Sequence, residues 1–147
     1  MKGNHDDWYN HFLTLNTHPV SWLQGGEGTL KSYCDNLGKW FEPKYSGYNT
    51  NLKSIDIPKS HIDFFNNQLP YYKDNNNNIF VHGGFDRLYK LDNQPDDEIF
   101  WWDRNLWNQA LSVKSGIGFE GMSKPSLKII EPCKEIFIGH TPTISWK

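Results

Sequence analysis

Apolar residues recur at helical spacing in the first half of the chain and predict three short helices there. Trp8, Phe12 and Leu15 lie on one helical face, and an aspartate at position 6 or 7 is expected to cap this helix. Two further apolar stripes are bounded by glycine or proline residues. They predict helices over residues 27–37 and 58–69.

The second half of the chain predicts β-strands as well as a helix. Tyr71–Tyr72 and Ile79–Val81 are β-rich runs on either side of an asparagine-rich turn, which is typical of a hairpin. A third short apolar run, Glu135–Ile138, predicts another strand. An acidic segment that begins at Pro95 indicates a helix start, and its apolar residues continue to Trp107.

Composition limits the fold and the function classes. A chain of 147 residues with 37% hydrophobic side chains fits one globular domain, residues 1–147, in which aromatic residues form much of the core. The predicted helices and strands place this domain in the α/β class. Residues 42–56 have turn formers without a clear period and predict a surface loop. The 15 lysine and arginine residues are balanced by 17 acidic residues, so we expect neither a nucleic-acid partner nor a membrane partner.

The cysteines and the first residues of the sequence indicate a cytoplasmic location. Cys34 and Cys133 are far apart in sequence, and we expect them to be buried small residues in a reduced, cytoplasmic protein. Residues 1–7 are polar where a signal peptide would be apolar, and no apolar run reaches the roughly 20 residues of a membrane span.

Three glycine-containing turns present a histidine or an asparagine, and two of them directly follow an apolar strand. These turns are Gly3-Asn4-His5-Asp6, Val81-His82-Gly83-Gly84 and Ile138-Gly139-His140-Thr141. Each turn alone is as readily a structural turn, but strand ends at one sheet edge converge on a common crevice. Imidazole nitrogens with amide or carboxylate oxygens suit manganese, iron or zinc, and the lack of thiolates argues against a structural zinc site.

The order GNHD, VHGG and GHT resembles the phosphoprotein phosphatase branch of the calcineurin-like metallophosphoesterases. This branch includes bacterial and phage serine/threonine protein phosphatases and symmetrical diadenosine tetraphosphatases. The resemblance spans nearly the whole chain and extends to residues 22–30 and 100–104. It implies a four-layer α/β/β/α sandwich and metal-dependent hydrolysis of phosphate esters, with manganese as the expected metal and iron or zinc as alternatives.

The resemblance also implies roles for individual residues. Asn4, His82 and His140 would bind the second metal of a two-metal site, and His5 would act on the leaving-group oxygen. Asp6 would orient His5, or cap the helix, and the two roles are compatible. Arg104 would hold the substrate phosphate, and the alternative that it is only a surface arginine remains open.

Family members begin with Asp-x-His and Gly-Asp-x-x-Asp-Arg-Gly turns, which this sequence lacks. We therefore expect a truncated sandwich without the amino-terminal and last strands. It would hold at most one metal, would be weak or inactive alone, and could self-associate through unpaired sheet edges. The alternative function is a non-catalytic remnant that binds phosphate or protein, and a third is a partly ordered, self-associating product.

The substrate class also stays open. A phosphorylated small molecule, such as a dinucleotide polyphosphate, and a phosphoprotein are both compatible with the shared motifs. The remaining histidines occur in no glycine-containing turn, and we assign them to surface positions or helix faces. They are His11, His18 and His61.

Overall fold

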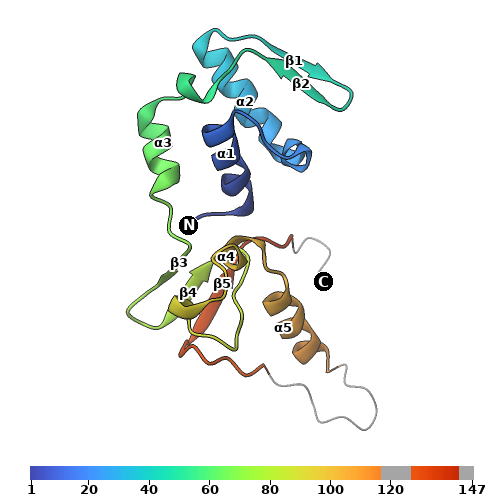
Figure 1. The fold of residues 1–147 in the computed structure, drawn as a ribbon. Coiled ribbons are helices and arrows are strands. Elements are labelled where there is room, and N and C mark those ends of the chain that lie inside the picture. Colours follow the sequence, from blue (N-terminus) through green and yellow to red (C-terminus); the bar gives the residue numbers. More distant parts are fainter. Residues whose placement is uncertain (117–126, 143–147) are drawn as a thin grey trace. The chain divides into compact units, whose positions relative to one another are not determined.

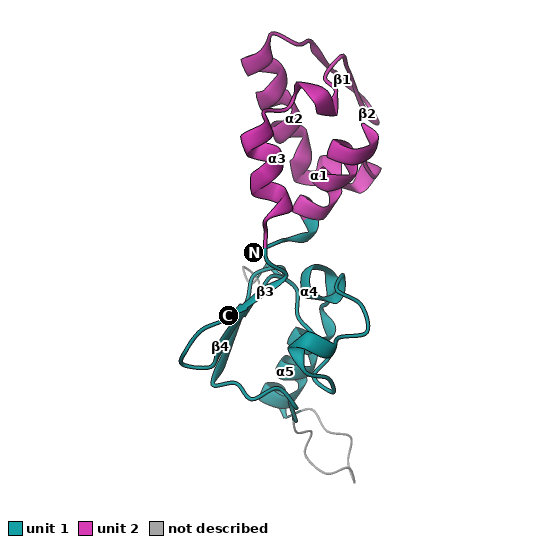
Figure 2. Ribbon diagram, turned by 60° about the vertical axis from the view of Figure 1, so that its left-hand side comes forward, with its two compact units in different colours: residues 1–4, 69–147 teal, residues 5–68 magenta. Residues whose placement is uncertain are grey.

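The computed structural model describes residues 1–116 and 127–142 and shows a mixed α/β fold (Figure 1). The chain divides into two compact units (Figure 2). Unit 1 comprises Met1–Asn4 and Leu69–Lys147, and unit 2 comprises His5–Gln68. That the whole chain is a single metallophosphoesterase domain stays a prediction.

Unit 2 contains the three predicted helices except for the first residue of α1, Asn4, which belongs to unit 1. The helices are α1 (Asn4–Leu15), α2 (Leu23–Leu37) and α3 (Lys59–Asn66). Two 3-10 turns, η1 (Val20–Trp22) and η2 (Ser54–Asp56), connect them with a hairpin. Helices of this length gain most of their stability from packing rather than from propensity. Here they pack on one buried cluster of Tyr9, Phe12, Trp22, Leu30, Cys34, Leu52 and Ile57.

The apolar face of α1 differs from the predicted one. Tyr9 and Phe12 are buried, whereas Leu15 is 61% exposed, so the buried face does not extend to Leu15 as the predicted apolar face did. The Tyr9 ring lies 5.6 Å from that of Trp22 and 4.6 Å from that of Phe65, and these contacts turn the helix toward position 9. The helix also begins before both aspartates, which lie in its first turn, where negative charge is favourable.

A β-hairpin occupies most of the segment that was predicted to be a surface loop. Strands β1 (Phe41–Lys44) and β2 (Gly47–Thr50) are antiparallel, with Phe41 opposite Thr50. Phe41 stacks on Tyr48 with ring centroids 5.0 Å apart, and this cross-strand pair stabilises the hairpin. Pro43 hides the alternation of so short a strand, because proline is usually depleted in strands.

The described part of unit 1 contains a three-stranded sheet of β3 (Tyr71–Lys73), β4 (Asn78–Val81) and β5 (Glu135–Ile138). All of these strands were predicted. β4 is the central strand, antiparallel to β3 and parallel to β5. One sheet face enters the core of the unit, which consists of Ile79, Val81, Phe85, Leu91, Phe100, Trp101 and Leu106.

The other sheet face carries a row of aromatic side chains, one from each strand. Tyr72 pairs with Phe80, and Phe80 pairs with Phe137. The rings of Phe80 and Phe137 are stacked with centroids 4.8 Å apart, yet Tyr72 and Phe137 remain about half exposed, at 52% and 47%. The sheet therefore carries apolar side chains on both faces, and among the described residues of unit 1 only one of these faces is buried in the core.

The helical segment after Pro95 is interrupted. A 3-10 turn, η3 (Leu91–Asn93), precedes α4 (Ile99–Trp102), and α5 (Asn105–Ser115) follows after a break. Asp103 causes the break, because its carboxylate accepts hydrogen bonds from the backbone N–H groups of Asn105 and Leu106, both at 3.0 Å. This capping starts a new helix where a continuous one was expected.

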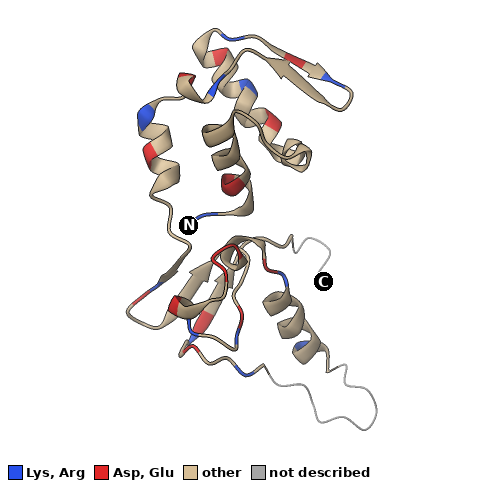
Figure 3. Cartoon of the chain, in the orientation of Figure 1, with Lys and Arg blue, Asp and Glu red and all other residues tan. Residues whose placement is uncertain are grey.

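Charged residues of both signs are interspersed along each unit (Figure 3). Lysine side chains of unit 2 pair with nearby carboxylates, as in Lys31–Asp35 at 2.6 Å and Lys39–Asp56 at 2.8 Å. Such local pairing offsets the positive charge of these lysines. Within the described residues, no helix has the length and apolar character needed to cross a bilayer.

Candidate metal centre

Strands β4 and β5 bring two of the predicted ligands together. His82 directly follows β4, and His140 lies two residues beyond β5. Parallel neighbours end at the same sheet edge, and the backbone strengthens this placement. The N–H groups of Gly139 and His140 both donate to the carbonyl oxygen of His82, at 3.0 and 2.8 Å. The imidazoles lie with ring centroids 5.0 Å apart.

Asn4 completes the group from the opposite end of the sequence. Its side chain is buried, with the residue only 8% exposed. Backbone contacts hold this end of the chain in unit 1, since the N–H of Lys2 donates to the carbonyl oxygen of Leu69 at 2.8 Å. The Lys2 ammonium also lies 4.0 Å from the ring centroid of Trp101, within the range of a cation–π contact.

Three potential donor atoms form a nearly equilateral triangle. Oδ1 of Asn4 lies 2.9 Å from Nε2 of His82 and 3.2 Å from Nδ1 of His140, and the two nitrogens are 3.0 Å apart. Ligands bound to one ion at about 2.1 Å lie about 3.0 Å apart when they meet at right angles, and about 3.4 Å apart in a tetrahedron. The triangle thus fits an octahedral ion such as manganese better than tetrahedral zinc.

Protons alone cannot satisfy all three contacts. Oδ1 carries no proton, and each ring nitrogen carries at most one. If His82 Nε2 and His140 Nδ1 are both protonated, two N–H donors face each other. If only one of them is protonated, the other nitrogen and the Asn4 oxygen face each other with lone pairs. A cation would receive all three lone pairs at once. The donor set therefore fits the metal that the family resemblance implies. Its ligands are two imidazole nitrogens and one neutral amide oxygen.

Arg104 lies beside the triangle. It occupies the break between α4 and α5, and its Nε donates a hydrogen bond to Nε2 of His140 at 3.0 Å. The side chain is exposed, which leaves the guanidinium accessible to solutes. Trp102 packs edge-on against the same imidazole, with centroids 6.3 Å apart. Four of the predicted site residues are thus close together in unit 1.

Gly83 packs against the backbone of the α4–α5 break, where Arg104 lies, and this particular contact was not predicted. Its N–H donates to the carbonyl oxygen of Phe100 at 2.7 Å. A Cβ atom at this position would lie 2.9 Å from the backbone nitrogen of Asp103 and 2.9 Å from the carbonyl carbon of Trp101. Only glycine allows the turn after β4 to lie so close to the α4–α5 break. The second glycine of the VHGG motif has a related contact with the Asp103 carboxylate.

His5 and Asp6 belong to unit 2, where they lie in the first turn of α1. His5 is exposed, and its ring lies 5.1 Å from that of Trp8 in an edge-to-face arrangement. Gly25 is its neighbour from α2, since a Cβ atom there would lie 3.1 Å from Cε1 of His5. The catalytic roles of His5 and Asp6 stay predictions.

The other histidines of unit 2 lie outside the metal centre. His18 hydrogen-bonds the Tyr48 hydroxyl and stacks on that ring, and Nδ1 of His61 lies 2.7 Å from the Tyr33 hydroxyl. Within residues 1–116 and 127–142, histidine, cysteine, aspartate and glutamate side chains form no cluster of three that could hold a metal. The amide of Asn4 is therefore essential to the proposed ligand set.

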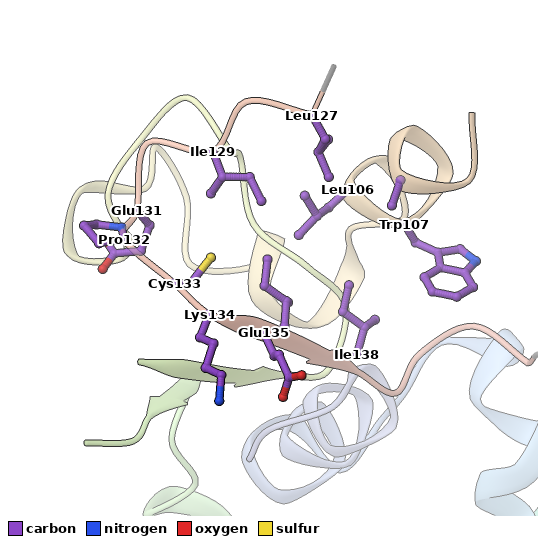
Figure 4. Close-up of a pocket in the computed structure, with 12 residues that line it drawn as sticks. Leu106, Trp107, Leu127, Ile129, Glu131, Pro132, Cys133, Lys134, Glu135 and Ile138 are labelled. Carbon is purple, nitrogen blue, oxygen red and sulfur yellow. The ribbon is translucent and has the colours of Figure 1, made fainter. Parts of the chain in front are cut away.

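A separate hollow in unit 1 has no predicted site residue in its lining (Figure 4). It has a volume of about 560 Å³ and lies between α5, β5 and the segment that precedes β5. Leu106 and Ile129 are among its apolar lining residues, and Glu131 and Lys134 supply charged groups. The size of a cavity does not identify a reaction centre, so the donor geometry carries more weight.

Comparison with known proteins returned no matching family model, curated protein or solved structure. The functional interpretation therefore depends on the three motifs and on the geometry of their side chains.

Proposed function

We propose that this protein hydrolyses phosphate esters in a metal-dependent reaction, as calcineurin-like metallophosphoesterases do. The observation that carries the proposal is the triangle of Asn4 Oδ1, His82 Nε2 and His140 Nδ1, with edges of 2.9, 3.0 and 3.2 Å. These atoms come from three motifs far apart in the sequence. Their convergence within unit 1 is what a shared ion requires.

Each residue has a role that its chemistry supports. Asn4, His82 and His140 would hold one divalent ion, with manganese as the expected metal, and iron or zinc as alternatives. Bound there, the ion supplies Lewis acidity that stabilises charge on the phosphoryl oxygens. Arg104 adds a planar, always charged fork that can bind two oxygens of the same phosphate.

The leaving group would be served by His5. Its imidazolium can give a proton to the departing oxygen, and Asp6 can orient the ring and favour the charged form. The substrate class is a phosphorylated protein or a phosphorylated small molecule.

A four-layer sandwich is the architecture that we propose. The sheet of unit 1 buries one face against α4 and α5 and presents Tyr72, Phe80 and Phe137 on the other. Aligned packing of a second sheet on such a face would remove these rings from water. The half-exposed aromatic row supports this proposal, because exposed apolar patches often mark a contact surface.

The test is manganese-dependent hydrolysis of a generic aryl phosphate, with metal content determined on the same sample. Because the sequence lacks the family motifs that hold the first metal, we expect turnover that is weak compared with complete family members. This turnover should require manganese and fall by roughly 10²–10⁴-fold in His5→Ala, the usual contribution of a general acid. His11→Ala is the matched control, since His11 is an exposed histidine on the same helix. Absence of both turnover and bound metal would refute the proposal. Bound metal without turnover would favour the non-catalytic binding function.

A further inference from the structure

The hydrogen bond between Arg104 and His140 determines which ring nitrogen of His140 carries the proton. Arginine has only N–H donors and stays charged at every pH at which the protein is folded. Nε2 of His140, 3.0 Å from the Arg104 Nε, must therefore accept with its lone pair. A neutral imidazole carries one proton, and the partner of one nitrogen decides where it resides. The proton is thus on Nδ1.

This tautomer fits the rest of the triangle in the absence of metal. Nδ1 of His140 faces Oδ1 of Asn4 at 3.2 Å and Nε2 of His82 at 3.0 Å, and both atoms can accept a hydrogen bond. This proton position satisfies two of the three contacts and leaves the 2.9 Å contact between Asn4 Oδ1 and His82 Nε2 without a proton. Arg104 on one edge of the ring and Asn4 on the other therefore favour the same proton position. The imidazole is held from both sides.

A metal ion requires the opposite arrangement. To bind through Nδ1 the ring must present its lone pair there, so the proton moves to Nε2. That nitrogen then points an N–H at the N–H of Arg104, and the contact has two donors and no acceptor. We propose that Arg104 is a positioning residue that holds His140 in the tautomer unable to bind metal, and that it is released when the metal binds.

The exchange needs no change in the charge of the ring, because only the proton position differs. This proposal rests on the proposed metal centre, and it adds a coupling between metal binding and phosphate binding. A phosphate that draws the guanidinium away from Nε2 leaves His140 free to adopt the metal-binding tautomer. Metal and phosphate should therefore each strengthen the binding of the other, because such coupling is reciprocal.

The first experiment records the tautomer directly in the metal-free protein. Two-bond ¹H–¹⁵N correlations of the imidazoles are measured near pH 8, above the ordinary histidine pKa of about 6.5. We expect wild-type His140 in the Nδ1–H form, Arg104→Met shifted toward the Nε2–H form, and Arg104→Lys, which retains a charged donor, close to wild type. Arg87→Met is the control, because Arg87 donates to Gln109 and to the backbone of Lys128 instead.

The second experiment measures manganese affinity by calorimetry for the same variants. We expect Arg104→Met to bind manganese about tenfold more tightly than wild type, and inorganic phosphate to tighten manganese binding in wild type but not in this variant. An affinity gain without a tautomer shift would reveal simple charge repulsion and overturn the proposal. If the protein binds no manganese, both the proposed metal centre and the proposed release of Arg104 on metal binding are refuted. The tautomer measurement tests the hydrogen bond between Arg104 and His140 independently of metal binding.

Discussion

The backbone N–H of His140 donates to the backbone carbonyl oxygen of His82 at 2.8 Å. Main-chain atoms, and not the imidazoles, therefore fix the spacing of the two turns. Replacing either imidazole should leave the sheet intact, so we expect His82→Ala and His140→Ala to lower manganese affinity by roughly 100-fold or more while the circular dichroism spectrum is retained. His61→Ala, a change in unit 2, should leave the affinity unchanged. Equal affinity in all three variants would place the metal elsewhere.

Substitution of Gly83 should destabilise the protein by displacing the backbone at the α4–α5 break. A Cβ atom there would lie 2.9 Å from the backbone of Asp103, and backbone atoms cannot rotate away. We expect Gly83→Ala to lower the free energy of unfolding by about 1–3 kcal/mol, measured by urea denaturation. Gly139→Ala is the matched control, because its Cβ would meet only an ordinary contact, 3.8 Å from Nδ1 of His82. Equal effects of the two changes would contradict this account.

Glu131 joins the segment before β5 to two other parts of unit 1. Its carboxylate pairs with Lys73 at 2.6 Å and accepts the backbone N–H of Leu91 at 3.2 Å, with its side chain only 11% exposed. Glu131→Ala leaves both partners without this acceptor and should destabilise the protein by about 1–3 kcal/mol, measured by thermal and urea unfolding. The exposed pair of Glu42 with Lys44 offers the comparison, and Glu42→Ala should have no measurable effect.

Buried tyrosines should make stability fall at high pH, and burial raises the pKa of Tyr9 above its ordinary value. Burial raises the pKa of Tyr48 to about 12, and burial together with the Asp92 carboxylate raises the pKa of Tyr71 to about 12, from an ordinary value of 10.0. The unfolded chain then loses these protons first, so stability is complete below pH 10 and decreases as the pH rises toward 12.

Urea denaturation at about pH 9 and pH 11 measures this loss, which we expect to be on the order of 1 kcal/mol per tyrosine after allowance for solvent screening. Tyr71→Phe removes one titrating group and should make the decrease smaller. An increase in stability between the two pH values would have the wrong sign for the proposed cause.

The elements that were predicted correctly have strong local signals. β3, β4 and β5 are short apolar runs bounded by turn residues. α2 ends at Leu37 and is followed by Gly38, which has the left-handed φ of 64° expected of a helix terminator. The strand signals also explain why His82 and His140 could be assigned to one edge before any contact was known. Convergence of parallel strand ends is a rule of topology, and it needs no knowledge of side-chain packing.

The elements that were missed depend on contacts distant in sequence. Leu15 continues the helical period of Phe12, but the rings around Tyr9 decide which face is buried. The hairpin at residues 41–50 has strands of four residues, too short for alternation to show through Pro43. Asp103 within an aromatic run was an available signal for a helix start, because aspartate is a favoured cap. The glycines of the VHGG turn indicated a close backbone approach, but no signal in the sequence identified its partner as the α4–α5 break.

Asn4 and His5 are consecutive residues, yet they fall in different units. A trans peptide bond keeps their Cα atoms about 3.8 Å apart, whatever the arrangement of the units. If Asn4 binds the metal, His5 is thereby tethered to it, and its effective concentration near the ion is set by covalent bonds. The covalent link between the two residues would therefore limit the distance of the proton donor from the ion, and the first turn of α1 would set the direction of its side chain.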